Sequence, residues 1–347
     1  MLGLAKLGQA AIGLGALLGA GALALLAPHQ TPDMRSHGVL PKYYGVNLPT
    51  AGFGHLPGVY GKDYVFDSRR TAAPFLAMGM TAVRVAVRWE RLQPVADAPL
   101  DPVELARLDH AIEGFNGFQL IIIDVHNYAR YRHHKLDEAS GSQLADLWSK
   151  LAVHYRSDPR IAFAIMNEPH DIGAHVWRNI AEQVVAAIRQ TGAKNLVLVP
   201  GTNWSGGHSW NKGGDDSNAV AMKGFSDPGR NFVFEIHQYL DIDSSGTHDD
   251  CLDEDVGPRR LAGVTNWLRA QHAKAFLGEF GVPPTPVCLR ALDHLLEFLN
   301  ANGDVWLGWT YWAGGARWHN YPYSIQPEGG QEKPQAAVLR KYIRGSR

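Results

Sequence analysis

Short hydrophobic runs recur along the chain from residue 43 onward. They are continuous rather than alternating and are rich in β-branched and aromatic residues, which is typical of strands buried on both faces. The runs span residues 43–48, 82–87, 120–125, 161–166, 196–199, 232–236, 275–277 and 305–309. Between most of them, hydrophobic residues recur at three- and four-residue spacing, which predicts helices. These helices span residues 102–115, 143–155, 176–190, 259–273 and 289–299.

Eight strand-like runs separated by helices predict an α/β protein built as one (β/α)8 barrel, the TIM-barrel fold, with a single catalytic domain. The fifth helix is the exception to the pattern. Residues 203–216 are rich in Gly, Asn and Trp, so only a short helix fits, near residues 218–223. A doubly wound sheet is the alternative architecture.

The first 27 residues have a different character. Residues 7–27 carry no charge and consist mostly of Leu, Ala and Gly, after a short positive start. This pattern predicts a signal peptide or an N-terminal membrane anchor over residues 1–27, a linker over 28–38 and the catalytic barrel over 39–347. We therefore expect an exported protein, either released outside the cell, held in the periplasm or anchored to a membrane through residues 7–27.

The predicted export would place the two cysteines, Cys251 and Cys288, in an oxidising compartment. An even number of cysteines in an oxidising compartment predicts a disulfide, and two unrelated buried thiols are the alternative.

The net charge of the chain limits which classes of molecule it is expected to bind. Lys and Arg number 33 and Asp and Glu number 34, a net charge of −1. Because such a chain lacks a broad basic field, nucleic acid is not expected as a partner.

Polar side chains collect where the predicted strands end. In a barrel of parallel strands these ends meet on one face, which is where barrel enzymes hold their active sites. Scattered polar residues would not select one end of so many strands. The side chains in question are Arg84, His126, Tyr128, Asn167, Glu168, Trp204, His237, Tyr239, Glu279 and Trp312.

Glu168 and Glu279 follow the fourth and seventh runs, so they should lie on opposite sides of the barrel mouth. Cleavage of a glycosidic bond needs such a pair, with one carboxyl group to protonate the leaving oxygen and one to attack or to activate water. The alternative is a structural role, in which both glutamates pair with Arg84 or Arg88. The position of both at strand ends favours catalysis.

Other chemistries find less support in the chain. His126 and His237 could bind a metal, but the expected strands that carry them hold no second His or Asp at the one- or four-residue spacing of common metal motifs. A G-x-S-x-G elbow is absent, as is a G-x-G-x-x-G after a strand. We therefore expect no metal and no cofactor. The acidic stretch at residues 241–250 lacks EF-hand spacing and is interpreted as a solvated loop.

Aromatic residues surround the predicted mouth. Sugar rings have apolar faces that stack on aromatic rings, so a polysaccharide cleft would be lined in this way. Trp204, Trp210 and Trp318 lie in expected loops and are predicted to face such a cleft. The tryptophans at helical spacing, Trp148 and Trp177 among them, are expected in the core together with Trp267.

In this order along the chain, the motifs resemble those of glycoside hydrolase family 5. They are GVN at 45–47, VRV at 83–85, ERLQP at 90–94, HNYARY at 126–131, IMNEPH at 165–170, HQYLD at 237–241, GEFG at 278–281 and WTYWA at 309–313. The segments 203–210 and 237–251 resemble the branch that contains endo-β-1,4-glucanases. The resemblance covers nearly the whole chain from residue 44.

The resemblance implies a retaining double displacement on a β-linked polysaccharide, cellulose or a related β-glucan, by a monomer without cofactors. Glu168 corresponds to the acid/base and Glu279 to the nucleophile. The substrate-binding positions that it implies are Asn47, Arg84, His126, Tyr128, Asn167, Trp204, His237, Tyr239, Trp312 and Trp318. A β-mannanase or xyloglucanase remains an alternative within the family. A non-catalytic carbohydrate-binding barrel and a metal-dependent hydrolase are alternatives of other classes.

Overall fold

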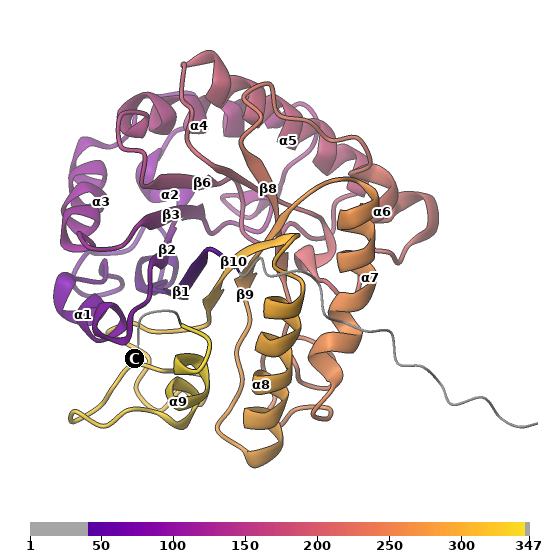
Figure 1. Ribbon diagram of the computed structural model, residues 1–347. Coiled ribbons are helices and arrows are strands. Elements are labelled where there is room, and N and C mark those ends of the chain that lie inside the picture. The colour runs from indigo at the N-terminus through magenta and orange to yellow at the C-terminus, as the bar shows by residue number, and fades with distance from the viewer. Residues whose placement is uncertain (1–40, 344–347) are drawn as a thin grey trace, which may run out of the picture. The chain divides into compact units, whose positions relative to one another are not determined.

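The computed structural model describes residues 41–343, which form a closed barrel of parallel strands ringed by helices (Figure 1). The strands lie in the order β1-β10-β9-β8-β7-β6-β3-β2, so the first strand closes the barrel against the last. The predicted (β/α)8 fold is confirmed. The strands are β1 Tyr43–Asn47, β2 Ala82–Val87, β3 Leu120–Val125, β6 Ile161–Ala164, β7 Val197–Pro200, β8 Phe232–His237, β9 Ala275–Glu279 and β10 Trp306–Tyr311.

The helices between the strands match the predicted positions to within a few residues. They are α3 Pro102–Gly114, α4 Gly141–Tyr155, α5 Ala174–Gln190, α7 Val256–Ala270 and α8 Pro286–Ala301. Asp101 caps α3, because its carboxylate accepts hydrogen bonds from the first-turn N–H groups of Val103 and Glu104. The helix after β7 is the short α6, Asn218–Ala221, as the sequence predicted.

Some elements were not predicted. The helix α1, Arg69–Met78, contains Pro74 and begins with two arginines, which disfavour a helix in the sequence, although Ala72, Phe75 and Met78 recur at helical spacing and are buried. The helices α2, Trp89–Leu92, and α9, Pro334–Arg340, are too short to show a period. A small hairpin, β4 Arg130–Tyr131 with β5 His134–Lys135, follows β3.

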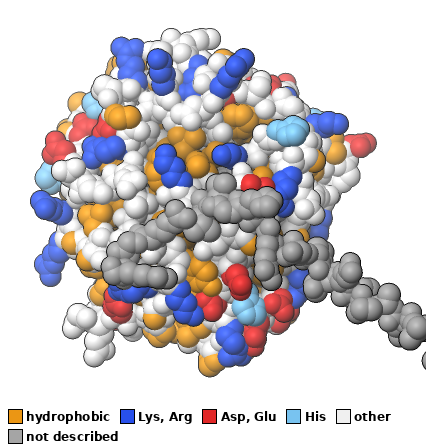
Figure 2. Space-filling model, in the orientation of Figure 1, with side chains coloured by type: hydrophobic (Ala, Val, Ile, Leu, Met, Phe, Trp, Pro, Cys, Tyr) orange, Lys and Arg blue, Asp and Glu red, His pale blue; other side chains and the backbone are white. Residues whose placement is uncertain are grey.

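The predicted signal or anchor at residues 1–27 and the linker at 28–38 lie outside the described residues. Among residues 41–343, no helix combines the length and the apolar character needed to cross a membrane. On the face turned to the viewer in Figure 2, Lys and Arg are interspersed with Asp, Glu and hydrophobic side chains. That mixture agrees with the near-zero net charge.

The tryptophans divide into core and surface groups. Trp148 and Trp177 are fully buried, and each ring N–H donates to a backbone carbonyl, of Ile165 and Pro200 respectively. The predicted core positions of these two residues are confirmed, and Trp267 packs partly buried against the same core.

The prediction that Trp210 faces the cleft is wrong. Trp210 is fully buried and its ring packs edge-on against Phe234 and Trp267, at centroid distances of 5.6 and 5.4 Å. The physical reason is the short α6. The loop after β7 turns Trp210 inward to cover the flank of the barrel that a full-length helix would otherwise cover.

The predicted disulfide is confirmed, since Cys251 and Cys288 are bonded with their Cα atoms 5.2 Å apart. Cys251 lies in the long loop after β8, and Cys288 lies in the first turn of α8. The bond therefore ties the loop that follows His237 and Tyr239 to the helix that follows Glu279.

Candidate active site

The carboxyl ends of the strands bring the predicted polar residues together. Asn47, His237 and Glu279 are the last residues of β1, β8 and β9. Glu168 follows β6 with a φ of 43°, a left-handed conformation that non-glycine residues rarely adopt and that is frequent at functional sites.

Arg84, in the middle of β2, is the central cation of the site and is almost fully buried. Its Nη1 donates to Glu279 Oε1 at 2.8 Å and to Asn47 Oδ1 at 3.1 Å. Its Nη2 donates to Asn167 Oδ1 at 2.8 Å and lies 3.1 Å from Asp124 Oδ1. One guanidinium group thus orients residues from the ends of four other strands.

Glu168 and Glu279 face each other across His237. The Nδ1 atom of His237 lies 2.8 Å from Glu168 Oε1 and 3.7 Å from Glu279 Oε2. One oxygen of each carboxylate lies within 4.8 Å of the other. Retaining glycosidases hold their carboxyl groups about 5–5.5 Å apart and inverting ones about 6.5–9.5 Å apart, so the spacing fits retention.

The two glutamates differ in their surroundings. The Glu168 side chain is 16% exposed, whereas the Glu279 side chain is 4% exposed. Burial raises the pKa of Glu279, and His237 and Arg84 oppose that rise. The Tyr239 hydroxyl donates to Glu279 Oε2 at 3.1 Å, and burial keeps the pKa of Tyr239 well above its usual value, so the hydroxyl stays a donor. These cations and this donor favour an ionised Glu279.

His126, just after β3, is held as a neutral ring. Its Nδ1 lies 2.7 Å from Asp124 Oδ2, while its Nε2 faces the Tyr128 hydroxyl at 3.1 Å and the Asn167 amide nitrogen at 3.4 Å. Nδ1 therefore carries the proton and Nε2 accepts. Burial lowers the pKa of His126 to about 3, which agrees with this assignment.

Aromatic rings wall the cleft. Trp312 stacks nearly parallel to His126, at 5.9 Å and 14°, and Trp318 meets Trp312 edge-on at 5.8 Å. Trp204 is 50% exposed and stacks on His170 at 4.6 Å. Trp204 and Trp318 thus lie beside the strand-end residues, and their contact with a sugar stays a prediction.

Phe53 is a wall residue that sequence reasoning missed. It is 40% exposed and meets Trp312 and Trp318 edge-on, at 6.0 and 5.6 Å. A hollow of about 430 Å³ next to it is lined by residues 52–56, Arg88, Tyr128 and His133. The signal available in the sequence was an aromatic residue between two glycines in the segment that follows the first strand.

Two groups in the described part of the chain have metal-ligand spacing. In the first, Glu168, His237 and Glu279, both nitrogens of the histidine face carboxylate oxygens; with these carboxylates ionised, both nitrogens carry protons and neither offers a lone pair to a metal. In the second, Asp241 Oδ2 already accepts from the backbone N–H groups of Thr247 and His248. The absence of a metal stays a prediction.

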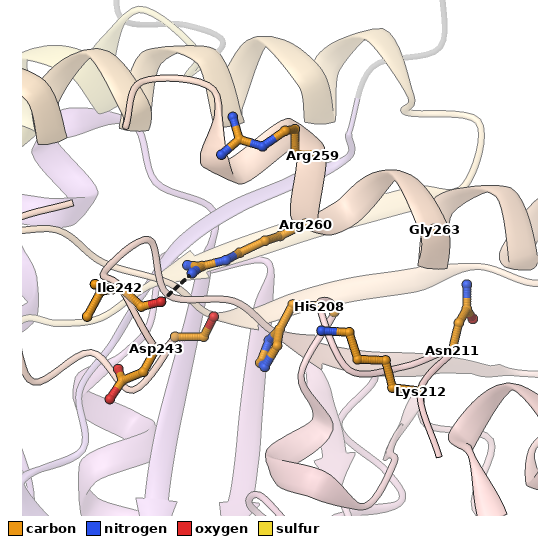
Figure 3. Close-up of a pocket in the computed structure, with 10 residues that line it drawn as sticks. His208, Asn211, Lys212, Ile242, Asp243, Arg259, Arg260 and Gly263 are labelled. Atoms are coloured by element: carbon orange, nitrogen blue, oxygen red, sulfur yellow. Dashed lines mark hydrogen bonds between the residues drawn. The ribbon is translucent and has the colours of Figure 1, made fainter. Parts of the chain in front are cut away.

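A second hollow, of about 460 Å³, lies between the loops after β7 and β8 and the helix α7 (Figure 3). His208, Lys212 and Arg260 point into it. The Arg260 guanidinium donates to the backbone carbonyls of Tyr239, Asp241 and Ile242. This arginine therefore braces the loop after β8, which contains Tyr239, on the side away from the barrel axis.

A (β/α)8 barrel with two facing, unequally buried glutamates and aromatic walls is the architecture of a glycoside hydrolase. The family model described as "Cellulase (glycosyl hydrolase family 5)" matches residues 42–315. The chain belongs to this cellulase family.

Relatives agree with that assignment. The chain is 34% identical over 308 residues to endoglucanase 3 of Humicola insolens, covering 87% of this chain and 78% of that protein. Among solved structures, it is similar to the endo-β-1,4-glucanase Xac0029 of Xanthomonas axonopodis pv. citri, with 42% identity, a TM-score of 0.85 and coverage of 87% and 98%. XacCel5A, solved in complex with cellopentaose, has 44% identity, a TM-score of 0.85 and coverage of 87% and 99%.

Proposed function

We propose that this protein is a retaining endo-β-1,4-glucanase that hydrolyses cellulose or related β-glucans. The observation that carries the proposal is the arrangement of Glu168 and Glu279 on the two sides of His237, at a spacing that suits double displacement. The choice of β-1,4-glucan is supported by the names of the relatives and by the cellopentaose complex of XacCel5A.

In the first step, the Glu279 carboxylate attacks the anomeric carbon while Glu168 gives its proton to the leaving glycosidic oxygen. This step forms a covalent glycosyl-enzyme and releases the part of the chain beyond the cleaved bond. In the second step, Glu168 takes a proton from water, and the water oxygen displaces Glu279. Two inversions at the same carbon leave its configuration unchanged.

The residues around Glu168 and Glu279 orient the nucleophile and bind the sugar. Arg84 and Tyr239 keep Glu279 ionised and fix its two oxygens. Asn167 and His126 present polar atoms to the sugar at the cleavage site, and Trp312 forms its floor. Tyr128, Trp204 and Trp318 extend the binding surface. Asn47 is fully buried and bonded within the protein, so we assign it to holding Arg84 rather than to contacting sugar.

We further propose that the enzyme works as an exported monomer, with residues 1–27 serving as a signal peptide or an anchor. The disulfide between Cys251 and Cys288 supports export, because such bonds persist in oxidising compartments. N-terminal sequencing of the protein recovered after expression in its full length would distinguish cleavage from anchoring.

Product analysis tests the substrate and the mechanism together. On carboxymethylcellulose, mixed-linkage glucan and glucomannan, we expect β-glucans to be cut internally, with β-anomers as the first products in proton NMR spectra. A preference for mannan or xyloglucan would favour the alternatives within the family. Initial α-anomers would exclude retention. Binding without hydrolysis would favour a non-catalytic barrel.

A further inference from the structure

Glu235 is a buried carboxylate for which the mechanism above has no use. It lies in β8 and is fully buried. Because side chains alternate along a strand, Glu235 faces the barrel interior on the same side as His237, two residues later. Its Oε1 lies 2.8 Å from Arg84 Nε and 3.4 Å from His237 Nε2.

Keeping this carboxylate in the barrel is costly. A buried charge must be compensated, and the Oε2 atom of Glu235 has no hydrogen-bond partner within residues 41–343. The neighbouring strand also leaves room for it. A Cβ atom at Gly278 would lie 2.3 Å from Glu235 Oε1, so only glycine fits beside the carboxylate. A group retained against such costs calls for a functional explanation.

His237 supplies that explanation, because both of its ring nitrogens face carboxylate oxygens. Nδ1 lies 2.8 Å from Glu168 Oε1, and Nε2 faces Glu235 Oε1. An ionised carboxylate only accepts hydrogen bonds, so both nitrogens carry protons when Glu168 and Glu235 are ionised. Burial opposes this charge, but Glu279, Glu168 and Glu235 together outweigh it and raise the pKa of His237 to about 10.

His126 is the comparison case, because only one of its ring nitrogens faces a carboxylate and its ring is neutral. Like His237, it follows an acidic residue of its own strand by two positions, Asp124 in its case. Its other nitrogen faces donors, Tyr128 and Asn167, rather than a carboxylate. The same local spacing therefore yields a neutral ring at 126 and a cationic ring at 237, and the difference lies in the partners across the barrel.

We propose that Glu235 is a positioning residue that keeps His237 doubly protonated, with its Nδ1–H directed at Glu168. This inference rests on the proposed role of Glu168 as the acid/base. The hydrogen bond from His237 occupies Oε1 of Glu168, so the proton for the leaving glycosidic oxygen resides on Oε2. Besides the three glutamates, the charged or titratable groups near His237 are Asp124 and His126 from β3. Arg84 shares the Glu235 oxygen with His237, and the Tyr239 hydroxyl shares Oε2 of Glu279 with it.

The charge on His237 is measured directly by ¹⁵N NMR of histidine-labelled protein, with the His237 signal assigned from its loss in His237→Gln. In the wild type we expect both ring nitrogens to be protonated at neutral pH and to stay so into the alkaline range. In Glu235→Gln the titration midpoint should fall by about 1–3 pH units, the effect of removing one nearby opposite charge.

Kinetics test the consequence for Glu168. In Glu235→Gln we expect kcat on cello-oligosaccharides to fall about 10²-fold with little change in KM, which is the lower range for general acid–base assistance. With a dinitrophenyl cellobioside, whose leaving group needs no proton, formation of the glycosyl-enzyme should be much less affected. Glu235→Asp, which keeps the charge, should restore part of the activity.

Glu104 provides the matched control. It is almost as buried, and its carboxylate accepts from Tyr64 and Arg107 outside the site. Glu104→Gln should leave both kcat and the His237 titration unchanged. If it lowers kcat as Glu235→Gln does, or if Glu235→Gln slows both substrates equally, the effect is structural and the proposal is wrong.

The wild-type spectrum decides the question even if Glu235→Gln does not fold. An unprotonated ring nitrogen on His237 at neutral pH would overturn the proposal without any variant at 235. Because the spectrum does not depend on turnover, its failure is distinct from a failure of the proposed function. That function is tested separately by the products and by the two glutamate variants considered below.

Discussion

The hydroxyl of Tyr239 donates a hydrogen bond to Oε2 of Glu279, and Arg84 donates to Oε1 of the same carboxylate. Each oxygen of the proposed nucleophile therefore has its own donor. Because each carboxylate oxygen has two lone pairs, one oxygen can attack the anomeric carbon while both donors hold the carboxylate in place.

Tyr239→Phe tests this relationship. Because the variant removes one preorganised donor, we expect kcat to fall by about 10²-fold with a smaller change in KM. The matched control is Tyr323→Phe, whose hydroxyl donates to the backbone carbonyl of His248 rather than to a catalytic group. Steady-state kinetics on a cello-oligosaccharide compare them, and equal losses in both variants would argue against a direct role for the Tyr239 hydroxyl.

Alanine variants of the two glutamates should give different products when azide is added. With an activated aryl glycoside, Glu168→Ala should still form the glycosyl-enzyme and then stall, and azide should restore turnover and give the β-glycosyl azide. Glu279→Ala cannot form that intermediate, so azide should give the α-glycosyl azide. Proton NMR of the products distinguishes the two anomers. The same anomer from both variants would mean that the roles are wrongly assigned.

Trp204 and Trp210 belong to one loop but should respond differently to replacement by alanine. Trp210 is fully buried, so Trp210→Ala should lower the free energy of unfolding by about 3–5 kcal/mol. Trp204 is half exposed, so Trp204→Ala should leave stability nearly unchanged but raise KM for long oligosaccharides. Urea unfolding and kinetics on substrates of increasing length measure both effects. A stability loss at 204 as large as at 210 would contradict this division.

Removing the disulfide should destabilise the barrel more than it alters the chemistry. The bond closes a loop with a sequence separation of 37 residues, so the double variant Cys251→Ser, Cys288→Ser should lose about 4 kcal/mol of unfolding free energy in the chain-entropy model. Thermal unfolding with and without reductant measures this, since the wild type under reducing conditions should approach the variant. A reductant-insensitive wild type would indicate that the loop is held by other contacts.

The buried pair of Arg189 and Asp227 predicts a pH dependence of stability. Burial opposes ionisation of Asp227, but hydrogen bonds from Arg189, Asn231 and Gly229 outweigh it and lower its pKa. The pair therefore contributes its full stability above the unfolded-state pKa of 3.8 and loses it as the pH falls through the lower folded-state value.

Asp227→Asn should thus cost about 3–5 kcal/mol at pH 7 and less at pH 3, which lies below the unfolded-state pKa of 3.8. Denaturant unfolding at the two pH values checks this. Glu254→Gln, which breaks an exposed pair with Arg290, is the control and should cost about 1 kcal/mol or less at either pH. A penalty at Asp227 that is independent of pH would show that charge is not its cause.

The proposed catalytic pair was predictable because its signal is local. Glu168 and Glu279 each follow a continuous hydrophobic run, and the order of the runs places them at one end of a barrel. The burial of Trp210 was not predictable from composition, because it depends on how much of the barrel flank the short α6 leaves uncovered. The presence of a tryptophan in a loop does not indicate whether its side chain points to the solvent or into the core.

Glu235 was harder still to recognise. In the sequence it is one polar residue inside a hydrophobic strand, which would be interpreted as a salt-bridged carboxylate. Its significance depends on Arg84, 151 positions earlier, on the ring of His237, and on the missing side chain at Gly278. Contacts of this range leave no periodic pattern, so they emerge only once the strands are assembled.

The side chain of Asn47 spans the seam where the first strand meets the last, since its amide donates to the carbonyls of Gly278 and Thr310 while its oxygen holds Arg84. The nucleophile's surroundings are therefore complete only after β10 has joined β1. During synthesis, residues 306–311 are among the last of the barrel to emerge, so a partly made chain has no assembled cleavage site. Catalytic competence should consequently appear late and all at once, as the final event of folding rather than growing with the length of the nascent polypeptide.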